Sequence, residues 1–109
     1  MPNDRTEQDN RRLHYELEHA IKAINTSAIG ALTGPITKEA FTSVAQTVAG
    51  LRARYLQSVV ALGAHADEAL LDDACAFELK RLREAYMEAM DGFSALQHAL
   101  DRGYVTLAD

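Results

Sequence analysis

The chain has 109 residues, a formal net charge of −5 and an apolar content of 48%. This length allows one domain of ordinary size, and the apolar content argues against wholesale disorder. The acidic balance argues against a nucleic-acid binder, which normally presents a basic face. The apolar residues are mainly 19 Ala and 13 Leu, with few Val and Ile, and this composition favours helix over sheet.

The first periodic segment follows a polar stretch. Residues 1–12 are expected to form a polar N-terminal arm. From Leu13 onward, apolar residues recur at steps of three and four, which predicts an amphipathic helix with one buried face. That face comprises Leu13, Leu17, Ala20, Ile21, Ile24, Ala28 and either Ala31 or Leu32. The helix is expected to end between residues 25 and 32, before the stop signal Thr33-Gly34-Pro35.

The second helix is predicted to begin after Thr37, a good N-cap residue, and to close at Gly63. Its apolar residues again recur at helical spacing. They are Phe41, Val44, Ala45, Val48, Leu51, Tyr55, Val59 and Leu62.

The third helix is predicted to begin near Asp67 and to stop at Gly103, a natural C-terminal cap. Its apolar stripe comprises Leu71, Cys75, Leu79, Leu82, Ala85, Tyr86, Ala89, Phe93, Leu96 and Leu100. The pair Asp91-Gly92 leaves open a break that would create a short fourth helix over 93–102. Because it lies on this stripe, Cys75 is expected to be a core thiol.

The connections 33–36 and 63–66 are short, and short connections place consecutive helices antiparallel to each other. The predicted fold is therefore all-α, an up-down-up antiparallel bundle of three long helices, with a fourth short helix after Gly92 as the alternative. The bundle is assigned to residues 13–103 as a single domain, followed by a C-terminal tail over 104–109.

The second helix lacks the charged outer face that a surface helix normally carries. Opposite its apolar stripe lies a band of mostly small residues at steps of three and four. We name this the small-residue band: Ser43, Thr47, Gly50, Arg54, Ser58 and Ala61. The band is interpreted as an interface with a second copy or another protein. The alternative is that these small polar residues simply face water.

Further apolar residues suggest additional contacts. Leu70 and Phe77 are seven residues apart and would form a docking ridge on the third helix. If the third helix is continuous, its end overhangs the other two, and Phe93, Leu96 and Leu100 then need a partner to cover them.

No catalytic or metal-binding motif is specific enough to assign. Glu16 and His19 form one Glu-x-x-His half-motif without the second copy that a di-iron bundle needs. His65 is considered as a phosphate-accepting histidine, but the acids Asp67 and Glu68 follow it and would repel phosphate. No catalytic residue, metal or cofactor is therefore predicted.

The expected function is that of a small non-enzymatic regulator. It would bind and sequester or modulate a larger protein, for example as an anti-activator of a transcription factor. The expected partners are a second copy and another protein, without nucleic acid or membrane. One cysteine and the absence of an apolar leader point to the cytoplasm. The alternatives are a secretion or assembly chaperone and a histidine phosphotransfer module using His65.

Overall fold

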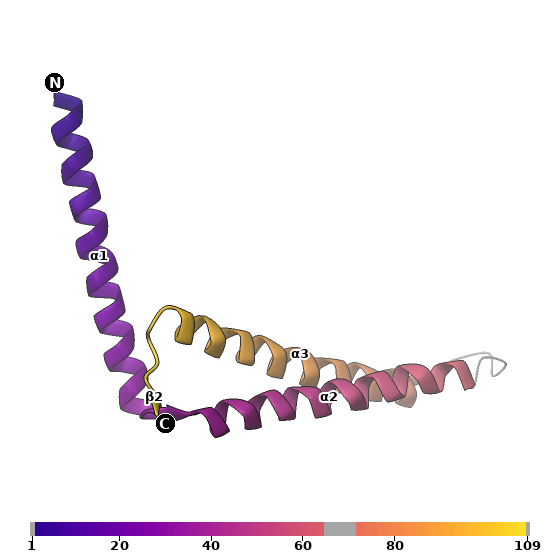
Figure 1. The fold of residues 1–109 in the computed structure, drawn as a ribbon. Helices are drawn as coiled ribbons and strands as arrows, with labels where there is room; N and C mark the ends of the chain where they lie inside the picture. The colour runs from indigo at the N-terminus through magenta and orange to yellow at the C-terminus, as the bar shows by residue number, and fades with distance from the viewer. Residues whose placement is uncertain (1, 65–71, 109) are drawn as a thin grey trace. The chain divides into compact units, whose positions relative to one another are not determined.

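The computed structural model describes residues 2–64 and 72–108 of the chain. Three helices and two short strands follow one another (Figure 1): α1 (Pro2–Thr33), β1 (Ile36–Thr37), α2 (Lys38–Ala64), α3 (Asp73–Asp101) and β2 (Leu107–Ala108). The described residues are 88% helical, which confirms the all-α expectation with three long helices. The up-down-up bundle and its assignment to one domain stay predictions.

The chain divides into two compact units. The first unit comprises Met1–Thr37 and His98–Asp109, and the second comprises Lys38–Gln97. The first unit therefore holds α1, the strand pair and the last turn of α3, whereas the second holds α2 and most of α3.

In the first unit, α1 already begins at Pro2, so the described part of the expected N-terminal arm is helical. Side-chain pairs four residues apart support these polar turns. Glu7 lies 3.9 Å from Arg11, and Arg12 donates a hydrogen bond to Glu16 at 3.3 Å. Such pairs stabilise exposed helical turns slightly even where no apolar residue is present.

The end of α1 is set by Gly34, which has a φ of 62°. This left-handed conformation strains any residue with a side chain but costs glycine little. The Gly34 amide donates to the Gly30 carbonyl at 2.9 Å, and Pro35 then prevents continuation. The predicted stop signal is confirmed, although α1 continues one residue beyond the expected range, to Thr33.

The end of α3 is capped in a related way by Gly103, whose φ is 75°. The amide of Tyr104 donates to the carbonyl of Ala99 at 2.8 Å, and the amide of Gly103 donates to the carbonyl of Leu100 at 3.0 Å. These two bonds together form a Schellman motif. The predicted stop at Gly103 is confirmed.

After Gly103 the C-terminal segment forms a second short strand. Strand β2 pairs in parallel with β1, with Leu107 opposite Ile36. Val105, just before β2, is only 7% exposed. The sequence analysis missed this pairing because strands of two residues carry no periodic pattern.

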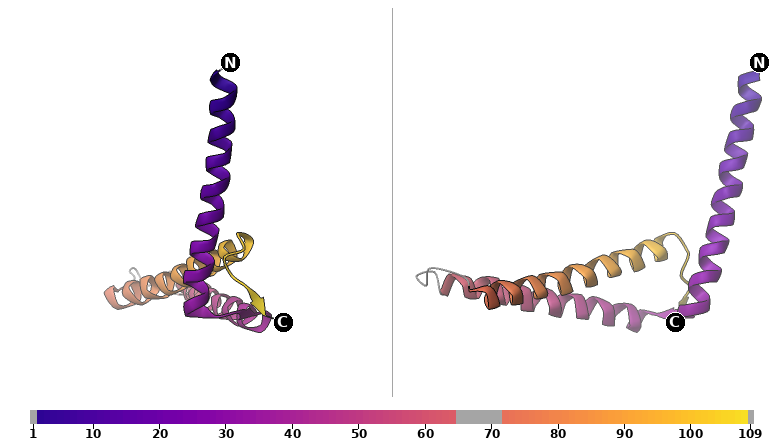
Figure 2. Two further views of the ribbon diagram at one scale, coloured as in Figure 1. Left: turned by 90° about the vertical axis from the view of Figure 1, so that its left-hand side faces the viewer. Right: turned by 180° about the vertical axis from the view of Figure 1, so that it is seen from behind.

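In the second unit, α2 and α3 lie side by side (Figures 1 and 2). Phe41, near the start of α2, meets Phe93, near the end of α3, whereas Tyr55 meets Tyr86. The two helices therefore run in opposite directions. Val48 is 5% exposed and is the one buried residue among those described in this unit. The core of this helical hairpin is accordingly thin.

Helix α3 is unbroken from Asp73 to Asp101. The alternative of a separate short helix after Gly92 is therefore wrong. The helix can pass through Gly92 because the apolar stripe stays in phase on both sides of it. The predicted start near Asp67 lies outside the described residues.

Candidate functional site

Helix α1 carries an apolar stripe that its own unit leaves largely exposed. We name it the α1 stripe: Leu13, Leu17, Ile21 and Ile24. The exposed fraction is 49% for Leu17 and 65% for Ile24. The unit that contains α1 therefore does not bury the face that was predicted to be buried.

The contacts that α1 makes within its unit lie on the opposite side of the helix. Thr26 donates a hydrogen bond from Oγ1 to the carbonyl of Gly103 at 3.4 Å, and the end of the Lys22 side chain lies beside Gly103. Thr26 follows Leu17 by nine residues, which is half a turn out of phase at 3.6 residues per turn. The C-terminal segment thus covers the back of α1 and leaves the α1 stripe open.

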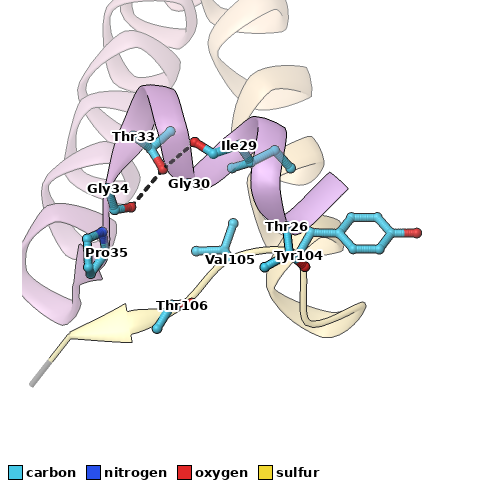
Figure 3. Close-up of a pocket in the computed structure, with 9 residues that line it drawn as sticks. All are labelled: Thr26, Ile29, Gly30, Thr33, Gly34, Pro35, Tyr104, Val105 and Thr106. Carbon is cyan, nitrogen blue, oxygen red and sulfur yellow. Dashed lines mark hydrogen bonds between the residues drawn. The ribbon is translucent and has the colours of Figure 1, made fainter. Parts of the chain in front are cut away.

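A shallow pocket of about 160 Å³ lies where this C-terminal segment meets α1 (Figure 3). Figure 3 shows Val105 directed toward the turns that carry Ile29 and Gly30, with Thr33 bonded to its own helix. Ligand pockets usually measure about 300–1,000 Å³. This pocket is better explained as a packing gap around Val105 than as a ligand site.

The described residues of its own unit do not cover the small-residue band on α2. Ser43, Thr47, Gly50 and Arg54 are exposed, and Ser58 is half-buried. A Cβ atom added at Gly50 would meet no atom within 4 Å. Coverage of this band by another chain stays a prediction.

A different apolar face of α2 was missed by the sequence analysis. We name it the α2 outer face: Ala49, Ala53, Leu56 and Val60. All four are exposed, and Val60 reaches 76%. Their steps of four, three and four are the sequence signal for this face, although two of the four residues are alanines, which also occur on solvated helix faces.

The opposite side of α2 contacts α3 through aromatic rings. The rings of Tyr55 and Tyr86 are stacked with centroids 6.2 Å apart. Arg52 lies 5.3 Å from the Tyr86 centroid and donates to its hydroxyl at 3.1 Å, and this hydroxyl donates to the sulfur of Met90 at 3.3 Å. These contacts occupy Arg52 within its own hairpin.

The outer side of α3 is charged, in contrast to α2. Arg81 bonds Glu78 at 2.6 Å, and Lys80 lies 3.7 Å from Glu84. The hydrogen bond from Arg81 lowers the pKa of Glu78 and raises that of Arg81. This surface has the charged composition expected of a helix face in water, so the unusual surface of the hairpin is that of α2.

The remaining predicted interface residues fall into different environments. Phe77 is 70% exposed, as a docking ridge requires, whereas Leu70 lies outside the described residues. Phe93 is half-buried and packs edge-to-face on Phe41 with centroids 6.0 Å apart, so α2 covers part of the expected overhang. Leu96 and Leu100 are also half-buried.

The expectation of a core thiol at Cys75 is wrong, because Cys75 is exposed. Cys75 lies in the first turn of α3. Its amide donates to Asp72 Oδ1 at 2.7 Å. Asp72 is therefore the N-cap of α3, and this hydrogen bond lowers the pKa of Asp72.

In the described part of the chain, no set of side chains suited to catalysis or metal binding lies together. The His19 ring lies edge-to-face on Tyr15 at 5.3 Å. No group of three or more His, Cys, Asp and Glu side chains there is placed to hold a metal ion. His65 lies outside the described residues. Among the described residues, no helix is both long enough and apolar enough to span a bilayer.

Comparison with known proteins found no matching family model, no matching curated protein and no matching solved structure.

Proposed function

We propose that this protein is a non-enzymatic regulator that acts by binding other proteins. It forms a homodimer and sequesters or modulates a larger protein, with an anti-activator of a transcription factor as the most specific form of the proposal. The cytoplasm is the proposed location, since the single cysteine fits a reducing compartment.

The observation that carries this proposal is the exposure of large apolar side chains on α1 and α2. Monomeric proteins rarely leave contiguous apolar faces open, and such faces mark sites of protein binding. A Leu or Ile side chain contributes about 1.5–3 kcal/mol when it passes from full exposure to full burial. Because Leu17 and Ile24 are this exposed, their burial by a partner would still contribute a large part of that free energy.

The lack of charge on α2 supports the same proposal. Residues 36–64 contain one acidic residue, Glu39, and three basic residues, Lys38, Arg52 and Arg54. Interface cores are depleted of charged residues relative to other surfaces. The α2 outer face and the small-residue band give two surfaces of this composition for a second copy, and the exposed Phe77 on α3 is left for the larger protein.

Paired affinity capture from the native host tests the proposal. The wild-type chain and the variants Phe77→Ser and Glu84→Gln serve as baits, the last as a control on the charged face of α3. We expect a partner that the wild type and Glu84→Gln retain, that Phe77→Ser loses, and whose activity falls in proportion to added chain. Inhibition by catalytic amounts of the chain would contradict a sequestering role.

The same material separates the two alternatives. Transfer of phosphate from a phosphorylated receiver domain to His65 would replace the proposal with the phosphotransfer function. Strong protection of the helices from hydrogen exchange by an extended client peptide would favour a chaperone.

A further inference from the structure

We propose that the end of the chain is a detachable clasp, which leaves α1 and β1 while the three helices stay folded. We name residues 105–108 the C-terminal clasp. Its release uncovers a binding surface for an extended segment of another chain, one that carries a branched apolar residue where Val105 lies and pairs in parallel with β1. The clasp and the surface beneath it belong to one unit of the chain, so the clasp does not depend on the proposed homodimer.

The side-chain packing of the clasp is slight. Val105 is the one buried residue among residues 4–37 and 98–108. Figure 3 shows it directed toward the turns of α1 that carry Ile29 and Gly30, and a gap of about 160 Å³ lies where the C-terminal segment meets these turns. A side chain beside a gap loses part of its van der Waals attraction. Val105 therefore packs loosely on α1.

The backbone of the clasp is held mainly by a strand pair of two residues. β2 pairs in parallel with β1, and the Ile36 amide donates to the Thr106 carbonyl at 2.9 Å. Even a two-stranded hairpin is only marginally stable in water, and parallel pairing is slightly less stable per residue than antiparallel pairing. Just before the clasp, the bond from Thr26 Oγ1 to the Gly103 carbonyl is long for hydroxyl and carbonyl groups, at 3.4 Å.

The helices have contacts of their own that do not involve the clasp. α2 and α3 are joined by the ring pairs Phe41–Phe93 and Tyr55–Tyr86, and the Schellman motif ends α3 before the clasp begins. Segments with few buried contacts and exposed backbone hydrogen bonds open without unfolding of the whole protein. We therefore expect the clasp to open alone, with Gly103 as the hinge.

The docked clasp shows what the surface beneath it accepts. It is an extended segment with Leu107 opposite Ile36, and it inserts one branched apolar side chain, that of Val105. Thr106 and Leu107 are exposed, so the surface makes few demands on the side chains there. A segment of another chain with this pattern would pair with the same Ile36 amide, as in strand addition at an open sheet edge. The docked clasp blocks such a segment and is an autoinhibitory contact.

Hydrogen exchange of the wild-type chain tests whether the clasp opens alone. The Ile36 amide should be protected at least about tenfold less than the Val48 amide, because Val48 is protected until the hairpin of α2 and α3 opens. Low concentrations of urea should change Ile36 exchange little, since opening of the clasp exposes little surface. Equal protection and equal urea dependence at the two amides would show that the clasp opens only with the whole chain, and would overturn the proposal.

A peptide of residues 103–108 tests whether the uncovered surface accepts a segment from another chain. Val105→Asp should release the clasp and speed Ile36 exchange, and the peptide should then slow this exchange again. Millimolar peptide is needed, because a tethered segment acts at millimolar effective concentration. Leu107→Asp places the same charge at an exposed position. In that control the clasp should stay docked, so that the peptide has little effect.

A second peptide, which carries the Val105→Asp change, shows whether the branched side chain is recognised. It should leave Ile36 exchange in the Val105→Asp chain unchanged. If the native peptide protects Ile36 no better than this second peptide, the surface does not select the proposed segment and the proposal is overturned. Circular dichroism of the two variants checks the helices. Loss of helix in Val105→Asp but not in Leu107→Asp would also contradict the proposal, since the clasp is expected to open with the helices intact.

Discussion

The backbone amide of Ile36 donates a hydrogen bond to the carbonyl oxygen of Thr106 at 2.9 Å. This bond joins the short connection between α1 and α2 to the C-terminal segment. Together with the pairing of Ile36 and Leu107, it joins the segment after α1 to the C-terminal residues in one small cluster.

Val105→Ala should loosen this cluster, because Val105 is nearly fully buried beside it. The loss of two methyl groups is expected to cost about 1–2 kcal/mol. Hydrogen exchange of the Ile36 amide should become faster, since its bond to Thr106 depends on the same segment. Leu107→Ala is the matched control, because Leu107 is exposed and its removal should leave this exchange rate unchanged.

Phe93→Leu should destabilise the hairpin of α2 and α3 by about 1 kcal/mol, since it removes the edge-to-face contact with Phe41. Phe77→Leu makes the same change on the same helix at an exposed position. There we expect a change in the free energy of unfolding below about 0.5 kcal/mol. Urea unfolding of both variants at low protein concentration measures the difference, and equal effects would show that the aromatic contact contributes nothing.

Asp72 makes the first turn of α3 dependent on pH. Its pKa in the folded chain lies below the ordinary value of 3.8, because the Cys75 amide donates to its carboxylate. A carboxyl group with a lowered pKa stabilises the fold above its unfolded pKa, and this contribution is lost as the pH falls through the lower, folded value. We expect Asp72→Ala to lower the helix content at neutral pH and to lose this acid transition.

Asp72→Ser provides the control for that measurement. Serine is also a good N-cap residue but does not ionise in this range, so helix content should remain while the acid transition disappears. An unchanged acid transition in Asp72→Ser would assign the pH dependence to another carboxyl group.

Glycine substitutions distinguish open helical positions from required turns. Gly50→Ala should stabilise the chain by about 0.5–1 kcal/mol, because Gly50 lies within a helix with space around it. Gly34→Ala should destabilise it by about 1 kcal/mol or more, because Gly34 has a positive φ. Thermal unfolding checks both signs. Destabilisation by Gly50→Ala at a concentration where the chain associates would indicate that another chain packs on the small-residue band.

Helix ends were predictable from the sequence where the cap is local. Gly34 with Pro35, Thr37 and Gly103 each mark a boundary through their own backbone chemistry, and α1, α2 and α3 end or begin there. Asp72 caps α3 in the same local way, whereas the predicted start near Asp67 lies outside the described residues.

The burial of particular faces was less predictable. Periodicity correctly placed Val48 and Phe93 on the contacting sides of α2 and α3. It could not show that Cys75 would be exposed, or that the unit containing α1 would leave Leu13 and Leu17 exposed. A helical pattern shows which side chains prefer burial, but not which molecule buries them.

The mass of the protein in solution tests the central claim most directly, namely that a second copy covers the exposed apolar faces of α1 and α2. Sedimentation equilibrium at tens of micromolar should report twice the chain mass of 12.0 kDa. The Leu17→Asp variant should report the mass of one chain. A wild-type protein that sediments as a single 12.0 kDa chain at this concentration would contradict the account.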